Sequence, residues 1–414
     1  MNALDPRRTI AELKELRSLT GDENGAQRVA FTKTWLAARD WLREKVAGLP
    51  LEIHNDAAGN TWFTLLGASE KCLLIGGHMD SVPNGGWLDG SLNVLAGVEI
   101  LRRINAQYNG KPPVTVRLVD WADEEGARFG KSLFGSSACS GNLNLDEARN
   151  LKDKDGIRLP DALREIGIDF ESVKENRGQL KNAAAYLELH IEQGPVLLDM
   201  DLPLAAVLGT FGVERHAINF HGQAAHSGST PMNRRKDAFL AAAKMSPEIY
   251  RIAERNGNGV CTIGSCTTKP GIVTSVVEDC RITLDQRHLD AKALATMLAD
   301  AKAASEKFAR EGNVTVSWER LWHIAPRPFN DELIALCDDS IRETCGKSHR
   351  MPSGPLHDAA EMTAAGVPTV MMFVQSLHGI SHNKIEDTKE EHLELAVTAF
   401  DKLAEKAMDW INRK

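Results

Sequence analysis

The stretch "CLLIGGHMDSVPNGGWLDGSLN", residues 72–93, joins a short apolar run to a glycine-rich loop that carries a histidine and two aspartates. Four apolar residues at its start, 72–75, are typical of a strand that is buried on both faces. Apolar residues then recur at helical spacing after the loop: Leu92, Leu95, Val98, Leu101 and Ile104. The stretch therefore predicts a strand, a loop holding His78, Asp80 and Asp89, and a helix that covers the sheet.

The same alternation of apolar runs and amphipathic stretches extends over residues 51–208, which predicts an α/β fold around a mainly parallel sheet. Near Gly209 the pattern changes to strand, helix, strand, helix, strand, which predicts a small open-faced α+β sandwich. We therefore expect two domains. One would comprise residues 1–209 and 327–414, and the other, residues 210–326, would be inserted into it.

Composition narrows the class of protein. The 414 residues carry 49 Lys and Arg against 57 Asp and Glu, a net charge of −8 with the two signs interspersed, which argues against nucleic acid and anionic membranes as partners. No run approaches the roughly 20 apolar residues that span a bilayer, and residues 1–20 lack the apolar core of a signal peptide. We expect a cytoplasmic protein whose seven cysteines, none in a CxxC pair, are reduced.

Acidic and imidazole groups follow several of the predicted strands. Besides the loop at 76–93, "DWADEEGARF" carries Glu124 and Glu125, "LELHIEQG" carries His190, and "SLHGISHNKIEDT" carries His382. The carboxyl ends of parallel strands meet at one edge of a sheet, where functional groups gather. Mixed nitrogen and oxygen donors are the ligands that Zn²⁺, Mn²⁺ or Co²⁺ accept.

Each of these signals has a structural alternative. A single histidine at a strand end is more often a hydrogen-bonded structural residue, "DEEG" alone is usually a solvated turn, and the glycines could simply form turns. Crowded acids and imidazoles, however, repel or stay unpaired unless a cation neutralises them. The combined pattern favours a metal site, in which a carboxylate such as Asp89 could bridge two ions about 3.5 to 4 Å apart.

Six motifs in order carry a family resemblance: "GGHMDSVPNGGWLDG", "ADEEGARF", "LELHIEQGP", "AAHSGSTPMNRRKDA", "LDQRH" and "HGISHNKIED". Together they resemble the hydantoinase/carbamoylase branch of the dinuclear-metal aminoacylase and carboxypeptidase superfamily. N-carbamoyl-L-amino acid amidohydrolases are the nearest group, with allantoate amidohydrolases and β-ureidopropionases close to them. The motifs run from residue 76 to residue 388, so the resemblance covers most of the chain.

The resemblance implies a metallohydrolase that binds two divalent ions per subunit, of Zn, Mn, Co or Ni. The ligands it implies are His78, Asp89, Glu125, His190 and His382. Asp80 would orient the His78 imidazole and fix its tautomer. Glu124 would be the general base that takes a proton from water and passes it to the leaving amine. A carbamoyl substrate would yield an L-amino acid, CO₂ and ammonia.

In such families the inserted domain acts as a lid and dimerisation module, so a homodimer is expected. His226 in "AAHSGSTPM" resembles the imidazole that stabilises the developing oxyanion, and it could act across the dimer interface. Arg287 in "LDQRH" resembles the arginine that binds the substrate α-carboxylate, and Gln193 would contact the ureido group. The structural alternatives are that His226 caps a turn and that Arg287 pairs with a neighbouring aspartate.

Two departures from the family pattern affect the expected substrate. Thr274 lies where relatives usually carry an Asn that helps to bind the carboxylate, and Leu356 lies where a small residue is usual. Gly354 and His357 still resemble residues of the pocket wall. The reaction class is expected to survive these changes, but the substrate side chain is not defined by the sequence.

Rival functions stay open. Within the same branch, allantoate or N-carbamoyl-β-alanine could be the substrate, and an N-acyl amino acid deacylase or dipeptidase is a more distant alternative. A non-catalytic ligand-binding or scaffold protein is the rival from a different class. Loss of a ligand or of the base would indicate that last state, but all five ligands and Glu124 are present.

Overall fold

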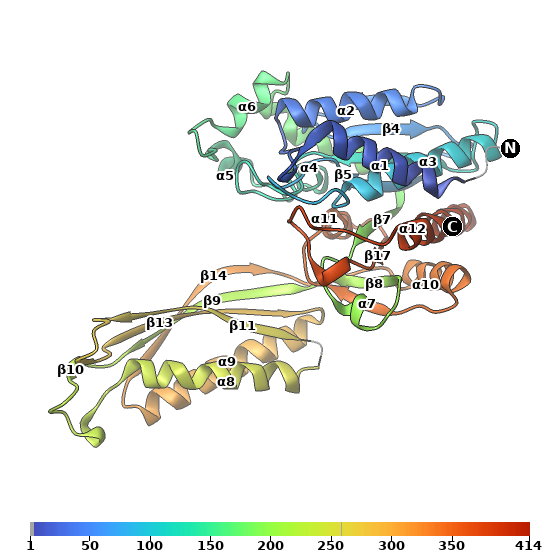
Figure 1. Cartoon of the computed structure of the whole chain (residues 1–414). Helices are drawn as coiled ribbons and strands as arrows, with labels where there is room; N and C mark the ends of the chain where they lie inside the picture. The colour runs from blue at the N-terminus through green and yellow to red at the C-terminus, as the bar shows by residue number, and fades with distance from the viewer. Residues whose placement is uncertain (1–3, 258) are drawn as a thin grey trace. The chain divides into compact units, whose positions relative to one another are not determined.

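The chain forms two compact units, Met1–Leu208 with Phe329–Lys414, and Gly209–Pro328. The computed structural model describes residues 4–257 and 259–414. In Figure 1 the colour runs along the chain, and the middle of the sequence, yellow-green to orange, makes up the second unit. The second unit is therefore an insertion between two segments of the first.

The larger sheet has nine strands in the described residues, in the order β15-β8-β17-β7-β5-β6-β4-β3 with β16 beside β8. The four central strands, β17, β7, β5 and β6, run parallel, whereas the strands on either side pair antiparallel. This confirms the α/β class with a mainly parallel centre. The strands are β3 (Glu52–Asn55), β4 (Thr61–Leu65), β5 (Cys72–His78), β6 (Thr115–Trp121), β7 (Ala183–Ile191), β8 (Leu204–Thr210), β15 (Arg327–Pro328), β16 (Arg350–Ser353) and β17 (Thr369–Val374).

The central strands are buried because helices pack on both faces of this sheet. Every residue of β5 is buried, as expected for a central parallel strand. One group of helices packs on itself and on the sheet: α1 (Pro6–Thr20), α3 (Ser91–Gln107), α10 (Asp331–Cys345) and α12 (Glu390–Arg413). A second group, α4 (Phe134–Ser140) and α11 (Asp358–Ala364), packs against β6, β7 and β17. The strand, loop and helix predicted for residues 72–93 are β5, its following loop and α3.

Shorter elements complete this unit. They are β1 (Gly21–Asp22), β2 (Gly25–Ala26), α2 (Lys33–Val46), α5 (Leu145–Arg149), α6 (Leu159–Glu165), the 3₁₀ segments η1 (Phe170–Leu180) and η3 (Leu377–Gly379), and α7 (Val196–Asp199). Across residues 4–257 and 259–414, no helix is both long and apolar enough for a membrane crossing.

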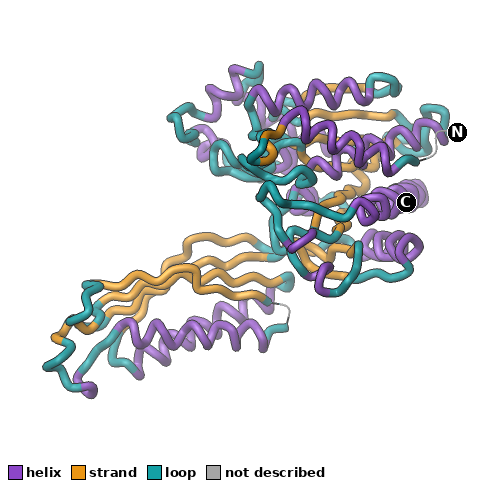
Figure 2. The backbone as a smooth tube through the Cα atoms, viewed as in Figure 1, coloured by secondary structure: helices purple, strands orange, loops and turns teal. Residues whose placement is uncertain are grey.

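The second unit is a four-stranded antiparallel sheet with two helices along one face (Figures 1 and 2). The strand order is β11-β13-β9-β14, and alternate residues of β13, among them Ile282 and Leu284, are buried under the helices. This is the α+β sandwich that the sequence predicts. The elements are β9 (Gly212–His221), β10 (Ala225–His226), η2 (Met232–Arg234), α8 (Ala238–Arg255), β11 (Val260–Lys269), β12 (Ser275–Val276), β13 (Asp279–His288), α9 (Ala291–Glu311) and β14 (Thr315–Ile324).

Candidate metal centre

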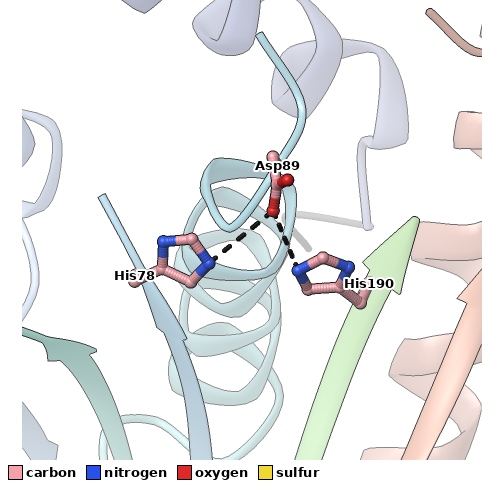
Figure 3. Close-up of side chains that lie close together, drawn as sticks. All are labelled: His78, Asp89 and His190. Carbon is pink, nitrogen blue, oxygen red and sulfur yellow. Dashed lines mark ion pairs between the residues drawn. The ribbon is translucent and has the colours of Figure 1, made fainter. Parts of the chain in front are cut away.

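Three side chains meet where two central strands end. His78 is the last residue of β5, His190 lies near the end of the adjacent parallel strand β7, and Asp89 comes from the loop between β5 and α3. Figure 3 shows both imidazoles pointing at the Asp89 carboxylate. Asp89 Oδ1 lies 3.1 Å from His190 Nε2 and 3.7 Å from His78 Nε2. These three residues form a group whose donor atoms are mutually within 4.8 Å.

The other oxygen of Asp89 faces a second group. Asp89 Oδ2 lies 3.5 Å from His382 Nε2, and Glu125 Oε2 lies 3.3 Å from the same nitrogen. Asp89, Glu125 and His382 again offer donor atoms within 4.8 Å of one another. The structure therefore brings together all five side chains proposed as ligands, in two groups that share Asp89.

The donor set fits a pair of divalent cations. Glu125 Oε1 is buried and has no hydrogen-bond partner among the described residues, so it is left with an unused lone pair aimed away from water. Imidazole nitrogens and carboxylate oxygens are suitable ligands for zinc and its first-row neighbours. The candidate ligands come from four separate segments, and a bound cation would hold these segments together.

Burial and the close approach of Asp89 to the two imidazoles shift the pKa values of these groups. Burial lowers the pKa of His78 to about 4. Burial also acts to lower the pKa of His190, but the adjacent Asp89 carboxylate more than offsets it and raises the pKa to about 9. Burial acts to raise the pKa of Asp89, but the facing imidazoles hold it far below its usual range. The imidazole of His190 and the carboxylate of Asp89 therefore stabilise each other's charged forms.

Glu124 and Glu125 follow β6 in a tight turn that one buried carboxylate anchors. Asp80 Oδ1 accepts the backbone N–H of Glu124, and Oδ2 accepts that of Glu125, both at 3.2 Å. Burial, and then the neighbouring Asp358, raise the pKa of Glu124 well above its usual range. Burial, and then Asp89, raise the pKa of Glu125 to about 10. Glu124 Oε2 lies 3.7 Å from His78 Nε2, so the predicted base is beside the first group of ligands.

Asp80 contacts the His78 imidazole through its backbone carbonyl rather than through its carboxylate. His78 Nδ1 lies 3.0 Å from the backbone carbonyl oxygen of Asp80 and 3.7 Å from its carboxylate. The carbonyl accepts the Nδ1 proton, which leaves Nε2 free to face Asp89. The carboxylate of Asp80 instead links this segment to the Glu124–Glu125 turn.

Two glycines are required by the close approach of the ligand loop. A Cβ on Gly90, which has φ +63°, would lie 2.4 Å from the His78 ring. A Cβ on Gly86 would overlap the Glu386 carboxylate. Glycine therefore allows the loop to carry Asp89 close to His78.

Residues without a predicted role also support the centre. Glu386, which is buried, accepts the backbone N–H groups of Leu88 and Asp89, each at 3.1 Å. Its second oxygen accepts the Ser381 hydroxyl at 2.7 Å. Glu386 thus connects the loop of Asp89 to the segment of His382. The sequence signal was the motif "HGISHNKIED", which contains Glu386 but does not indicate its partner 297 residues away.

The residues proposed to contact substrate in this unit lie around the same ligands. Gln193 Nε2 donates to Asp89 Oδ2 at 2.8 Å. The ring of His357 lies 4.5 Å from that of His190, and its Nε2 is 2.9 Å from Ser353 Oγ. Gly354 directly follows Ser353 at the end of β16.

The remaining three predicted residues lie in the second unit. His226 Nδ1 accepts the backbone N–H groups of Gly228 and Ser229, at 3.1 and 3.2 Å, so it does cap a turn. The carbonyl of Thr274 accepts the N–H of Ser227, which brings Thr274 close to His226.

Arg287 lies on β13 and makes the surface pair that the sequence left open. Its Nε donates to Asp285 Oδ1 at 2.8 Å, and Arg215 binds the other oxygen of Asp285 at 2.7 Å.

Comparison with known proteins gives consistent relatives. The model of peptidase family M20/M25/M40 matches residues 74–406. An N-carbamoyl-L-amino acid amidohydrolase of Geobacillus stearothermophilus is 34% identical over 382 residues, 89% of this chain and 90% of the relative. An allantoate amidohydrolase of Escherichia coli (strain K12) is 32% identical over 387 residues, 92% of this chain and 93% of the relative. A solved hydantoinase/carbamoylase family amidase from Burkholderia ambifaria superposes with a TM-score of 0.87 at 29% identity, covering 97% of each chain.

Proposed function

The chain belongs to peptidase family M20/M25/M40, and on that premise we propose that it hydrolyses the carbamoyl C–N bond of N-carbamoyl-L-amino acids. The expected hydantoinase/carbamoylase branch is confirmed, so the chain is a metal-dependent amidohydrolase that acts on C–N bonds. The products would be an L-amino acid, CO₂ and ammonia. The carbamoyl substrate itself is our proposal, because similar relatives are named for two different ureido substrates.

One observation carries the proposed site, namely that the two oxygens of Asp89 face two different groups of donors. We assign the first divalent ion to His78, Asp89 and His190, and the second to Asp89, Glu125 and His382. Zn, Mn, Co and Ni all accept this donor set. The bound ions would supply Lewis acidity and a water of lowered pKa at this point.

The chain's own groups would manage the proton. Glu124 has a buried carboxylate whose raised pKa suits it to take a proton at Oε2 and to deliver it to the leaving amine. Asp80 holds the backbone of Glu124, so the carboxylate stays oriented during the transfer. Gln193 Oε1 is buried without a hydrogen-bond partner in the described residues, and we assign it to an N–H of the ureido group.

The second unit would complete the site as a lid and dimerisation module. We assign Arg287 and Thr274 to the substrate carboxylate, His226 to the developing oxyanion, and Gly354 with His357 to the pocket wall. In one copy, Arg287 and Asp279 lie at opposite ends of β13, about 27 Å apart at strand spacing. His226 belongs to the Asp279 end, because β10 and β12 adjoin the strand termini there.

That separation exceeds the length of a carbamoyl amino acid, so Arg287 and His226 of one copy cannot both contact the same substrate molecule. This supports a homodimer in which a second copy supplies one of the two groups. Exposed apolar side chains on α8 and β11 are consistent with such an interface: Phe239, Leu240, Tyr250 and Val260. Light scattering would measure the dimer. Mixing the inactive variants His226→Ala and Glu124→Gln should restore activity that neither has alone, and no recovery would place His226 within its own subunit's site.

A substrate panel tests the activity. The metal-loaded protein would be incubated with N-carbamoyl-L-amino acids, N-carbamoyl-β-alanine, allantoate, N-acetyl amino acids and dipeptides, and released ammonia and amine would be measured. We expect the highest kcat/KM for an N-carbamoyl-L-amino acid, with chelated protein as the blank. Preference for allantoate is the second candidate, supported by the 32% identity to the allantoate amidohydrolase. No turnover of any ureido compound would refute the proposal.

A further inference from the structure

A fully buried arginine, Arg28, lies beside the candidate metal centre. Arg28 has 0% exposure, and among residues 4–257 and 259–414 no carboxylate oxygen lies within 4.0 Å of its guanidinium. Within the described residues, its side-chain hydrogen bonds go to neutral oxygens. Nε donates to the carbonyl of Met79 at 2.8 Å, NH2 donates to Ser91 Oγ at 2.8 Å, and NH1 donates to Thr20 Oγ1 at 3.3 Å.

Two of these acceptors belong to the segments that carry the ligands. Met79 lies between His78 and Asp80, and Ser91 follows Asp89 by two residues. A single rigid guanidinium therefore spans the segment at the end of β5 and the turn into α3. The backbone N–H of Arg28 donates to the hydroxyl of Ser81, and the backbone carbonyl of Arg28 accepts the N–H of Ser81, both at 3.1 Å. Arg28 thus fixes the distance between the two segments that meet at the first metal position.

The other side of Met79 is fixed in the same way. Its N–H donates to Asp120 Oδ1 at 2.8 Å, and Arg39, also buried, donates through Nε to Asp120 Oδ2 at 2.5 Å. Both peptide groups of Met79 are therefore held by buried charged side chains. Met79, which lies between His78 and Asp80, therefore has little conformational freedom.

A buried cation without an ion pair is expensive, since desolvation is not compensated by direct contact. Burial lowers the pKa of Arg28 to about 10, so it remains charged at neutral pH, while the carboxylates of Glu386, Asp80 and Asp89 act to raise it. An apolar side chain could join these segments without that desolvation penalty. A buried guanidinium is favoured beside a cluster of negative charge. Its planar group of N–H donors can also bind three acceptors at fixed angles.

We propose that Arg28 is a positioning residue of the metal centre, which holds the His78–Asp80 and Asp89–Ser91 segments at the separation that the cations require. The inference rests on the proposed metal-dependent function. It concerns a residue whose side chain bonds to Met79, Ser91 and Thr20 rather than to a proposed ligand side chain. The competing explanation is that Arg28 only stabilises the fold.

The test compares two arginines of the same unit. Arg28→Met removes the charge and the donors, Arg28→Lys keeps the charge, and Arg102→Met is the matched control. Arg102 is also largely buried, binds Glu12 and Glu99, and lies eleven residues beyond Ser91 on α3, about 16 Å away. Metal affinity would be measured by competition with a chromophoric chelator, and site geometry by the visible absorption spectrum of the Co²⁺-loaded protein.

We expect Arg28→Met to weaken affinity for at least one ion by about 10- to 100-fold and to change the Co²⁺ spectrum. Arg28→Lys should recover part of both. Arg102→Met should lower thermal stability but leave both metal readouts as in the wild type. If Arg28→Met does not fold, the spectrum of Arg28→Lys decides the question.

Wild-type affinity and spectrum in the soluble Arg28 variants, with stability lowered as in Arg102→Met, would overturn the proposal. A wild-type chain that binds no divalent metal would overturn both this inference and the metal centre. A wild type that binds metal but cleaves no ureido compound would refute the proposed substrate and leave the role of Arg28 intact.

Discussion

The two units of this chain treat their carboxylates in opposite ways. In Gly209–Pro328, carboxylates pair with cations near the surface, as Asp285 does with Arg215 and Arg287. In the other unit, the buried carboxylates of Asp80, Asp89 and Glu124 lie close to the half-buried Glu125, and no Lys or Arg nitrogen of the described residues lies within 4.0 Å of the four groups. A buried acidic cluster that lacks its own cation is stable only if one is supplied. The acidic cluster of the larger unit is therefore suited to bind a cation, whereas the carboxylates of Gly209–Pro328 form ordinary surface ion pairs.

Metal removal should have the largest effect on turnover and stability, and it should destabilise only the unit that carries the candidate metal centre. Chelation is expected to abolish turnover and to remove up to about 4 kcal/mol of stability at a thousandfold excess of metal over Kd. Hydrogen exchange should rise in the loop at 76–93 and in the Glu124–Glu125 turn, while the sheet of Gly209–Pro328 keeps its protection. Equal loss of protection in both units, or an active metal-free protein, would contradict the contrast.

Replacing the proposed base should come next in size. Glu124→Gln keeps the shape and removes the proton acceptor, so kcat should fall by about 10²-fold or more. Metal content, measured by elemental analysis, should not change, because Glu124 is not assigned as a ligand. Glu319→Gln, in the exposed pair with Arg281, is the matched control and should keep full activity. Near-normal turnover in Glu124→Gln would assign the base elsewhere.

The motif resemblance singles out the five proposed ligands, whereas local pattern alone shows only acids and imidazoles at strand ends and in a glycine-rich turn. The alternation around His190, for example, predicts a strand, and parallel pairing then brings its end close to the strand that carries His78. The supporting contacts could not be read in this way. Arg28 binds a backbone carbonyl 51 residues away, and Glu386 binds backbone N–H groups at Leu88 and Asp89. Any residue type can supply a backbone carbonyl or N–H, so the sequence does not reveal which residue is the partner in such a contact.

The effect of pH should differ between the units in the metal-free protein. Burial raises the pKa of Asp80 to about 6 and of Glu125 to about 10, against about 4 when unfolded. The folded state then binds more protons than the unfolded state, so stability falls as pH rises from about 4 toward 8.

In the second unit, the pKa of Asp285 is shifted in the opposite direction. Burial acts to raise its pKa, but Arg287 and Arg215 hold it below its usual range, so its contribution is present above about pH 4 and is lost in acid. Protection factors, which correct for the intrinsic base catalysis of exchange, should therefore fall between pH 5.5 and pH 8 in the metal-binding unit only when they are measured on chelated protein. The pH dependence should disappear when metal is restored, and a slope that persists in the metal-loaded protein would reject this origin.

Breaking a single surface pair of the second unit should have the smallest effect. Arg281 and Glu319 lie 2.8 Å apart, with 42% and 56% of their side chains exposed, so solvent screens the attraction. A double-mutant cycle with Arg281→Gln and Glu319→Gln should give a coupling of about 0.2 to 1 kcal/mol in chemical denaturation. The same pair placed in a buried site would be worth more, because water no longer competes. A coupling of several kcal/mol would mean that the second unit also depends on cooperative charge networks, and the contrast between the units would then be one of degree.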